Sequence, residues 1–286
     1  MKNIWQFLMT CLVAGGIAFA VTSSTGATTT PQTRETVYDR IMHTHEIRCG
    51  YVYYPPLLMK DPNTGAFSGI GADVMRRVAE LMNVKLIWTE ETSWATYIEG
   101  LQTNRYDMLC TLDFFLPFYA GKVETTSPLF YTGIGIYKRA DDTRFPEVFR
   151  NFDNPDITVS AIDGSIAMHI QESDYPHAKL LSVPNMSDYA FTLMNVVNKK
   201  ADITFVERAV GNNFLKTNPG AVVNIADKEP LRIYPYFVPF KIGETKLQST
   251  LNGLIIFLRD NSEIDKILSR YENGTPSFYR VAKGYR

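Results

Sequence analysis

Hydrophobic and polar positions alternate with two different periods along most of the chain. From Ile47 onward, runs with the period of a β-strand, such as IRCGYVY, VKLIWT and YDMLCTL, are separated by stretches with the period of a helix. One helical stretch places Val74, Val78 and Leu81 on one face, and a short helix is predicted before the first strand, in TVYDRIMHTHE. This alternation is typical of α/β proteins with mainly parallel sheets flanked by helices.

One part of this plan occurs twice in the sequence. The stretch that begins KLIWTEETSW at Lys85 and the stretch that begins KLLSVPNMSD at Lys179 each continue from strand to helix to strand. In both, an aspartate (Asp107 and Asp202) opens the second apolar strand. An internal repeat of this size predicts two lobes with the same local plan.

The chain is expected to cross between these lobes twice. Extended segments around Tyr137–Asp141 and Ile233–Phe237 would lead into and out of the second lobe. We therefore predict that lobe 1 comprises residues 36–138 and 234–286, that lobe 2 comprises residues 139–233, and that two hinge strands join them. Hinges of this kind let two lobes close around a ligand.

The N-terminal residues have the composition of a secretion signal. MKNIWQFLMTCLVAGGIAFA combines Lys2, an apolar run and a final Ala-Phe-Ala, which is the pattern of a signal that is cleaved. The run contains two glycines and is followed by polar residues without a basic cluster, which disfavours a membrane anchor. We predict a signal peptide over residues 1–20, a flexible tether over residues 21–35, and hence a periplasmic location.

Composition excludes several classes of function. Lysine and arginine number 29 against 30 aspartates and glutamates, and no block of basic residues supplies the attraction on which nucleic-acid binding depends. His43 and His45 could form half of a metal site, but histidines at this spacing near a helix end are more often solvated, and His169 and His177 have no ligand-like neighbours in the sequence. Neither a nucleophile elbow nor a phosphate-binding loop is present. We expect neither a metal nor a cofactor.

Two cysteines, Cys49 and Cys110, lie beyond the predicted signal peptide, both in strand-like stretches. In an oxidising compartment they could form a disulfide if their strands are neighbours. They could also pack as two buried free thiols, and we favour this alternative because disulfide geometry rarely suits adjacent strands.

The order of the segments resembles the extracellular solute-binding proteins of family 3, whose members capture amino acids for ABC importers. The segments that carry the resemblance are IRCGYVYYPPL, DPNTGAFSGIGADVMRRVAELM, TSWATYIEGLQTNRYDML, TTSPLFYTGIGIYKR, SAIDGS, KKADITFVE and NSEIDKILSRYENG. The resemblance implies the two-lobed fold of the type II periplasmic binding proteins and a small molecule held between the lobes. It also implies a monomer whose partner is a membrane permease or a membrane receptor, and no catalytic residues.

The resemblance implies aromatic ligand contacts in the first lobe. Tyr51, Tyr53 and Tyr54, at the end of the first strand, would supply the ring that stacks on the ligand. Trp94, before the second helix of the lobe, would cover the other face of the ligand. A large side chain next to a helix start can also cap the core of its lobe, so both roles stay open for Trp94.

In the amino-acid binders that the sequence resembles, the loop after the third strand supplies polar groups and an arginine that clamps the ligand carboxylate. The matching loop supplies Thr111, Asp113 and Phe114, but Tyr119 occupies the arginine position. A tyrosine offers one hydroxyl and a ring and cannot neutralise a carboxylate. The departure puts binding of a free α-amino acid in doubt.

In the second lobe, Gly164 and Ser165 resemble a turn that binds anions at a helix N-terminus. Glu207 corresponds to the acidic residue that holds the ligand's ammonium group, although a surface salt bridge is the alternative. With this acid kept and the arginine absent, the sequence predicts an amine or an amino-acid derivative with a masked carboxylate as ligand. A dehydratase-like enzyme on the same fold is the remaining, less favoured alternative.

Overall fold

The computed structural model describes residues 35–116, 119–146, 151–272 and 276–281. From Val37 onward these residues belong to one structural unit. The predicted signal peptide (1–20) and all of the predicted tether (21–35) except Glu35 lie outside the described residues. Within the described ranges, no helix has both the length and the apolar character needed to cross a membrane.

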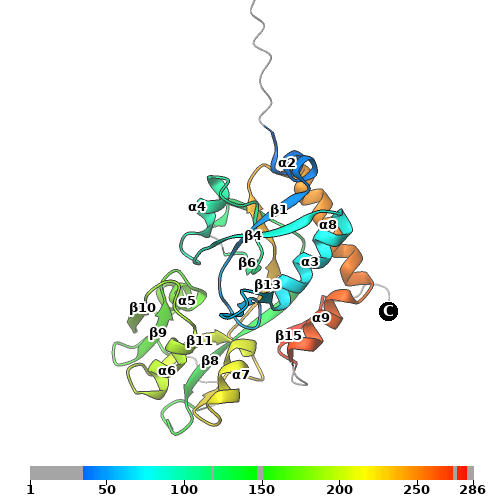
Figure 1. The fold of residues 1–286 in the computed structure, drawn as a ribbon. Helices are drawn as coiled ribbons and strands as arrows, with labels where there is room; N and C mark the ends of the chain where they lie inside the picture. Colours follow the sequence, from blue (N-terminus) through cyan, green and yellow to red (C-terminus); the bar gives the residue numbers. More distant parts are fainter. Residues whose placement is uncertain (1–34, 117–118, 147–150, 273–275, 282–286) are drawn as a thin grey trace, which may run out of the picture. The chain divides into compact units, whose positions relative to one another are not determined.

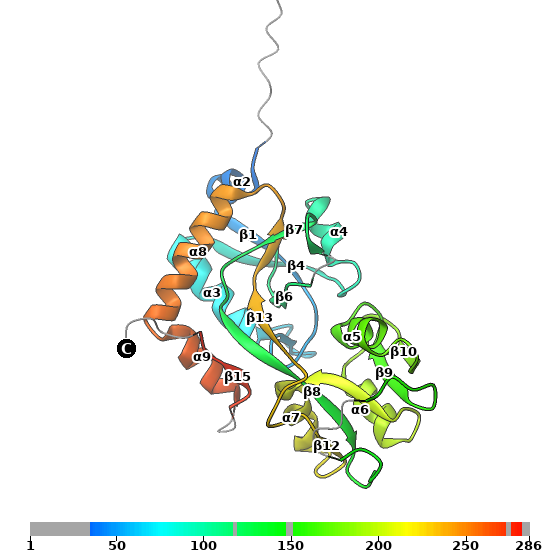
Figure 2. The same ribbon diagram turned by 180° about the vertical axis from the view of Figure 1, so that it is seen from behind.

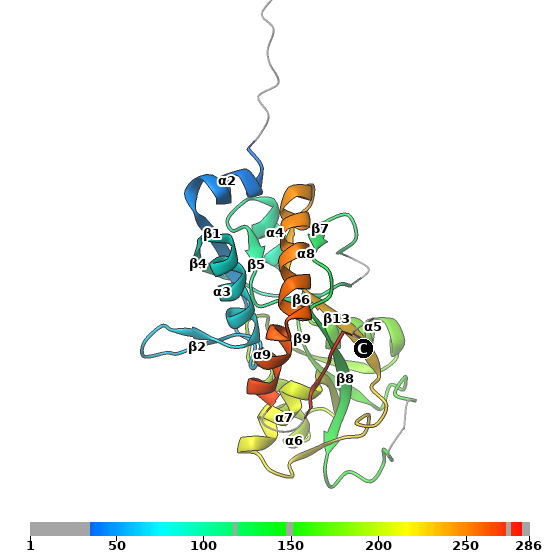
Figure 3. The ribbon, with the colours of Figure 1, turned by 90° about the vertical axis from the view of Figure 1, so that its right-hand side faces the viewer.

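The first of two large sheets has the strand order β4 (Lys85–Glu91), β1 (Glu46–Tyr51), β5 (Met108–Leu109), β14 (Pro239–Lys241) and β7 (Val123–Thr125). Strand β1 is parallel to β4 and β5, whereas β14 is antiparallel to β5 and β7. The helices that pack against this sheet or on one another beside it are α2 (Val37–Thr44), α3 (Ile70–Met82), α4 (Tyr97–Gln102), α8 (Thr245–Asp260) and α9 (Glu263–Glu272) (Figures 1 and 3). A short hairpin of β2 (Met59–Lys60) and β3 (Phe67–Ser68) precedes α3.

The second sheet has the strand order β10 (Lys179–Val183), β9 (Thr158–Ile162), β11 (Ile203–Glu207), β8 (Phe130–Arg139), β13 (Arg232–Phe237) and β6 (Asp113–Phe114). Strands β12 (Val222–Asn224) and β15 (Phe278–Tyr279) also pair with β8. Helices α5 (Ile166–Asp174), α6 (Ala190–Val197) and α7 (Arg208–Thr217) pack against it. The predicted α/β class is confirmed, and the parallel pairing joins β10, β9 and β11 as it joins β4, β1 and β5.

The two sheets repeat one local plan, as the internal repeat predicts. In each, the middle strand of the parallel trio is first in sequence and the two flanking strands come from the repeated stretch. Asp107 accepts a hydrogen bond from the Arg48 amide at 2.6 Å, and Asp202 accepts one from the Thr158 amide at 2.8 Å. The amides of Asp107 and Asp202 donate back to the carbonyls of Arg48 and Thr158 at 2.9 and 2.8 Å. The aspartate that opens the strand therefore fixes its start against the neighbouring strand in both sheets.

Two neighbouring strands of the second sheet, β8 and β13, are joined in sequence to strands of the first sheet. β8 follows β7 of the first sheet, and β13 leads directly into β14 of the first sheet. The two strands are antiparallel, with Phe130 opposite Tyr236 and Ile134 opposite Arg232 (Figure 2). The chain thus passes between the sheets twice in extended form, while the predicted lobe boundaries at residues 138 and 233 stay a prediction.

Cys49 and Cys110 form a disulfide, so the expectation of two free thiols is wrong. Cys49 lies in β1 opposite Met108 of β5, and Cys110 follows the last residue of β5. Cys110 is therefore outside the ladder of paired residues, one position beyond the end of β5. The Cα atoms are 5.5 Å apart, within the range that a disulfide spans.

Gly71, in the first turn of α3, lets the helix approach the segment that leads to β6. A Cβ atom at this position would lie 2.4 Å from the Cys110 carbonyl oxygen and 3.0 Å from that of Thr111, and neither backbone atom can rotate away. We expect Gly71→Ala to lower the free energy of unfolding by about 1–3 kcal/mol, as overpacking does, measured by urea denaturation.

Gly253 in the middle of α8 provides the matched control. A Cβ atom there would meet no atom within 4 Å. Because alanine favours the helix over glycine by about 1 kcal/mol, Gly253→Ala should leave stability unchanged or raise it. Equal stability of the two variants would show that α3 does not depend on this close approach.

Candidate ligand-binding site

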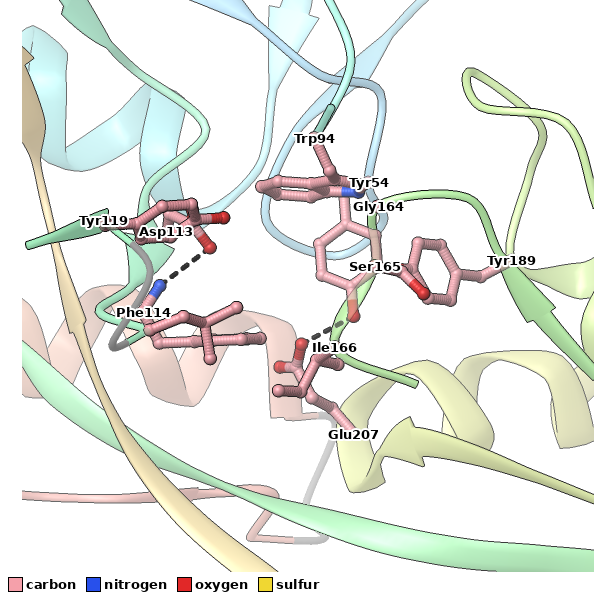
Figure 4. Close-up of a pocket in the computed structure, with 11 residues that line it drawn as sticks. Tyr54, Trp94, Asp113, Phe114, Tyr119, Gly164, Ser165, Ile166, Tyr189 and Glu207 are labelled. Carbon is pink, nitrogen blue, oxygen red and sulfur yellow. Dashed lines mark hydrogen bonds between the residues drawn. The ribbon is translucent and has the colours of Figure 1, made fainter. Parts of the chain in front are cut away.

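One pocket brings together strand residues of the second sheet and residues of loops, among them the loops that follow β1 and β4 of the first sheet (Figure 4). The free space among these side chains is small, about 10 Å³, so a ligand larger than a water molecule requires side chains or loops of the wall to move. Its wall consists mainly of aromatic and acidic side chains. The lining residues are Tyr54, Trp94, Asp113, Phe114, Leu116, Tyr119, Gly164, Ser165, Ile166, Tyr189 and Glu207.

Glu207, the last residue of β11, has both carboxyl oxygens hydrogen-bonded. The Tyr54 hydroxyl donates to Oε1 at 2.5 Å, and the Tyr236 and Thr132 hydroxyls donate to Oε2 at 2.7 and 3.1 Å. The side chain is 1% exposed, and burial raises its pKa while the three hydroxyls oppose the rise. Because Tyr54 follows β1 and Glu207 ends β11, this network ties the first sheet to the second.

Asp113, in β6, is the second buried carboxyl group of the pocket. Its Oδ1 accepts a hydrogen bond from the Phe114 amide at 2.8 Å, whereas Oδ2 is buried without a hydrogen-bond partner in the described part of the chain. Burial raises the pKa of Asp113 to about 7, and the nearby Tyr97 and Tyr119 hydroxyls act in the opposite direction. At neutral pH this carboxyl group is therefore partly protonated and can take up or lose a proton.

Aromatic rings form much of the remaining wall. The Tyr54 ring lies edge-on to Trp94, with centroids 5.4 Å apart, and 4.7 Å from the ring of Tyr189. Phe114 stacks at 5.0 Å on Tyr234 of β13, which holds the Phe114 ring in place. Such faces attract organic cations through their ring quadrupoles.

The turn before α5, which contains Gly164 and Ser165, lies close to the loop that contains Trp94. Gly164 has φ of 75°, a conformation that glycine adopts without strain. A Cβ atom on Gly164 would lie 3.0 Å from the Cβ atom of Ala95, next to Trp94. Ser165 precedes the first residue of α5, and its Oγ is buried without a hydrogen-bond partner in the described ranges.

Most of the site residues predicted from the sequence meet in this pocket. These are Tyr54, Trp94, Asp113, Phe114, Tyr119, Gly164, Ser165 and Glu207. Glu207 makes no surface salt bridge, since it is buried and bonded to hydroxyls. Trp94 lines the pocket and also packs against the hydrophobic core, so both of its predicted roles stay open.

Three predicted residues lie elsewhere, and the structure corrects their placement. Tyr51 still belongs to β1, and its ring packs against Phe67 and Trp88 in a small hydrophobic cluster separate from the main core. Tyr53 is 41% exposed and does not line this pocket. Thr111 is buried with its hydroxyl bonded to the amide and carbonyl of Val52, at 2.8 and 2.9 Å, so it fixes the loop after β1.

The sequence interpretation missed Leu116, Ile166 and Tyr189, which also line the pocket. The internal repeat contains a signal for Tyr189. It aligns Ser93 with Ser187, so Tyr189 is one position beyond the counterpart of Trp94. The two lobes therefore present aromatic residues from corresponding loops, each before a helix.

The fold is similar to that of solved amino-acid-binding proteins. One is an ancestral amino acid-binding protein described as a precursor of cyclohexadienyl dehydratase, with a TM-score of 0.73, 23% identity, and coverage of 82% of this chain and 99% of that chain. Another is the cysteine-binding protein from Campylobacter jejuni, with a TM-score of 0.70, 19% identity, and coverage of 82% and 92%. The chain has the two-lobed fold of the type II periplasmic binding proteins, as predicted.

Sequence comparison places the chain in a family. The model of the bacterial extracellular solute-binding proteins, family 3, matches residues 47–274, and the chain belongs to this family. A probable amino-acid ABC transporter-binding protein of Haemophilus influenzae is 24% identical over 263 residues, covering 90% of this chain and 93% of the relative. The L-cystine-binding protein TcyA of Bacillus subtilis is 22% identical over 225 residues, covering 76% and 77%.

Proposed function

We propose that this chain is a periplasmic solute-binding protein that captures a small organic ammonium ion in the pocket and delivers it to an ABC-type permease. The observation that carries the proposal is the charge of the pocket wall. Two buried carboxyl groups line it, those of Asp113 and Glu207, and among the described lining residues there is no basic side chain. A buried carboxylate without a cationic partner is costly, so a cationic ligand is the complement that this wall selects.

The aromatic part of the wall supports the same ligand class. Tyr54, Trp94, Phe114 and Tyr189 provide rings around the carboxyl groups, and cation–π attraction adds to the ion pair. Tyr119 at the position of the expected arginine leaves a ligand carboxylate without a charged partner. An amine without a free carboxylate therefore fits better than a free α-amino acid.

Delivery to a permease is the part of the proposal that the family supports. Both relatives named above carry amino-acid or cystine binding in their names, and one is named for an ABC transporter. In this proposal the two extended connections, β8 and β13, serve as the hinge that closure and release require. The alternative partner, in place of a permease, is a membrane receptor that binds the closed form of the protein.

A dehydratase-like reaction is a second candidate, because Asp113 has one property of a general acid. Its pKa of about 7 lies near a physiological working pH, where proton transfer by a side chain is most effective. The similarity of the fold to that of an ancestral precursor of cyclohexadienyl dehydratase is a second reason to consider a dehydratase reaction. The missing carboxylate clamp argues against the acidic substrates of such an enzyme.

A thermal-shift screen of the chain without residues 1–20 tests the proposal. At a hundred times its Kd a ligand adds about 2.7 kcal/mol to stability, which raises the melting temperature by roughly 5–10 °C. We expect shifts of this size for tyramine, agmatine or 1,4-diaminobutane and none for aspartate or succinate. Shifts with free α-amino acids and none with amines would contradict the amine proposal, and conversion of a bound compound, followed by mass spectrometry, would contradict the binding-only function.

A further inference from the structure

The two carboxyl groups of the pocket differ in how fully the protein satisfies them. Glu207 accepts hydrogen bonds on both oxygens, from three hydroxyl groups that belong to three separate segments. Asp113 accepts one, from the amide of the next residue, and its Oδ2 has no partner in the described part of the chain. The large majority of buried polar atoms in proteins have a hydrogen-bond partner. A carboxyl oxygen without one in a pocket wall is therefore expected to accept a hydrogen bond from a ligand.

A ligand would have to disrupt existing bonds in order to reach Glu207. The Tyr54 hydroxyl occupies Oε1 at 2.5 Å, and Tyr54 itself lines the pocket (Figure 4). Displacing it would leave a buried hydroxyl without its acceptor, which costs about as much as a new hydrogen bond contributes. The cost at Asp113 is smaller, because its Oδ2 has no hydrogen-bond partner in the described part of the chain, although the nearby Tyr97 and Tyr119 hydroxyls interact with its carboxyl group and oppose the rise of its pKa.

From this difference we infer that Asp113, and not Glu207, is the anionic partner of the ligand's cation, and that the cation carries N–H donors. Glu207 is a positioning residue that holds Tyr54 against the second sheet. The inference rests on the proposed function, and it narrows the ligand class from organic cations in general to those with at least one N–H group, which are primary, secondary and tertiary ammonium ions. A quaternary ammonium ion has no hydrogen to donate to Oδ2 and would leave it unpaired.

The surroundings of Asp113 favour a short ion pair. The side chain is 3% exposed, so water screens the interaction little and the charge-assisted hydrogen bond is strong. Phe114, next in the strand, lines the pocket beside the carboxyl group and leaves an apolar face for the carbon atoms of the ligand. The titratable groups that act on Asp113 are the hydroxyls of Tyr97, Tyr119, Tyr189 and Tyr236 and the carboxyl group of Glu207, and each is neutral or acidic.

Two isosteric variants, Asp113→Asn and Glu207→Gln, separate the two roles. Isothermal titration with tyramine, agmatine and 1,4-diaminobutane measures the affinity of each variant against wild type. We expect Asp113→Asn to weaken the tightest of these amines about 100-fold or more, as loss of one partner of a buried charge pair does, and Glu207→Gln to weaken it less than about tenfold. The N-trimethylated form of the same amine should bind the wild type about as weakly as the amine binds Asp113→Asn.

The melting temperature of the ligand-free variants distinguishes binding from structural roles. Asp113→Asn removes a buried charge with an unpaired oxygen, so at pH 8 it should melt at or above the wild-type temperature. Glu207→Gln replaces an acceptor of three hydroxyls and should melt lower. A stable Asp113→Asn variant that has lost the amine supports the inference.

The remaining outcomes overturn the inference in distinguishable ways. If the wild type binds amines and Glu207→Gln loses as much affinity as Asp113→Asn, or more, the assignment to Asp113 is wrong while the proposed function stands. Equal affinity for the trimethylated amine would show that no N–H donor is needed. If the wild type binds none of the amines, the proposed ligand class is wrong and the inference fails with it.

Discussion

Between pH 8 and pH 5, the affinity of the protein for a primary alkylamine is expected to fall about a hundredfold, because Asp113 must be ionised to hold the cation. Its pKa of about 7 in the ligand-free protein means that the proton competes with the amine below neutral pH. Each pH unit below the pKa then weakens binding about tenfold, or about 1.4 kcal/mol. An alkylammonium ion, with a pKa near that of lysine, about 10.4, stays charged over the whole range.

Isothermal titration of tyramine or 1,4-diaminobutane at half-unit steps of pH measures this dependence. The Glu207→Gln variant is the control, since its binding should fall with pH as that of the wild type does. Affinity that stays constant from pH 8 to pH 5 would show that Asp113 does not carry the cation. A fall that disappears in Glu207→Gln would assign the titration to Glu207.

Removal of the disulfide between Cys49 and Cys110 is expected to lower the free energy of unfolding by about 4 kcal/mol. The two cysteines are 61 positions apart, and a cross-link over a segment of that length removes much of the freedom of the unfolded chain. Urea denaturation of the double variant Cys49→Ala/Cys110→Ala measures the loss. Both residues are fully buried beside each other, so alanine adds no steric conflict.

Reduction of the wild type provides an independent control for the same bond. Denaturation in excess reductant should give the midpoint of the double variant, and reductant should not change the double variant itself. A double variant as stable as the oxidised wild type would mean that the disulfide does not contribute to folding stability.

The hydrophobic pattern predicted the architecture because the periods of strands and helices depend only on residues close together in the sequence. Strand and helix periods identified the elements around β1, α3 and β4, and the repeat predicted that β4 to β5 and β10 to β11 fold alike. The state of the cysteines could not be predicted in the same way. It depends on where β5 ends relative to β1, since Cys110 lies just beyond the paired residues, and no local pattern fixes that point.

Where several residues of one type stand together, the sequence could not select the one that lines the pocket. Among Tyr51, Tyr53 and Tyr54 the sequence offers no means of choice, because β1 ends at Tyr51 and only the turn that follows directs Tyr54 into the pocket. The sequence could not predict either that Glu207 is fully hydrogen-bonded or that Asp113 is not, because this difference depends on hydrogen-bond partners from other parts of the chain. Tyr54, Tyr236 and Thr132 come from distant parts of the chain and meet at Glu207 only in the folded structure.

A crystal structure of the protein with its tightest-binding amine tests the central claim most directly. The account predicts the ammonium nitrogen within about 3 Å of Asp113 Oδ2, with the carbon atoms against Phe114 and the Tyr54–Glu207 hydrogen bond intact. A nitrogen bound at Glu207 in place of the Tyr54 hydroxyl, or an amine outside the pocket, would contradict it.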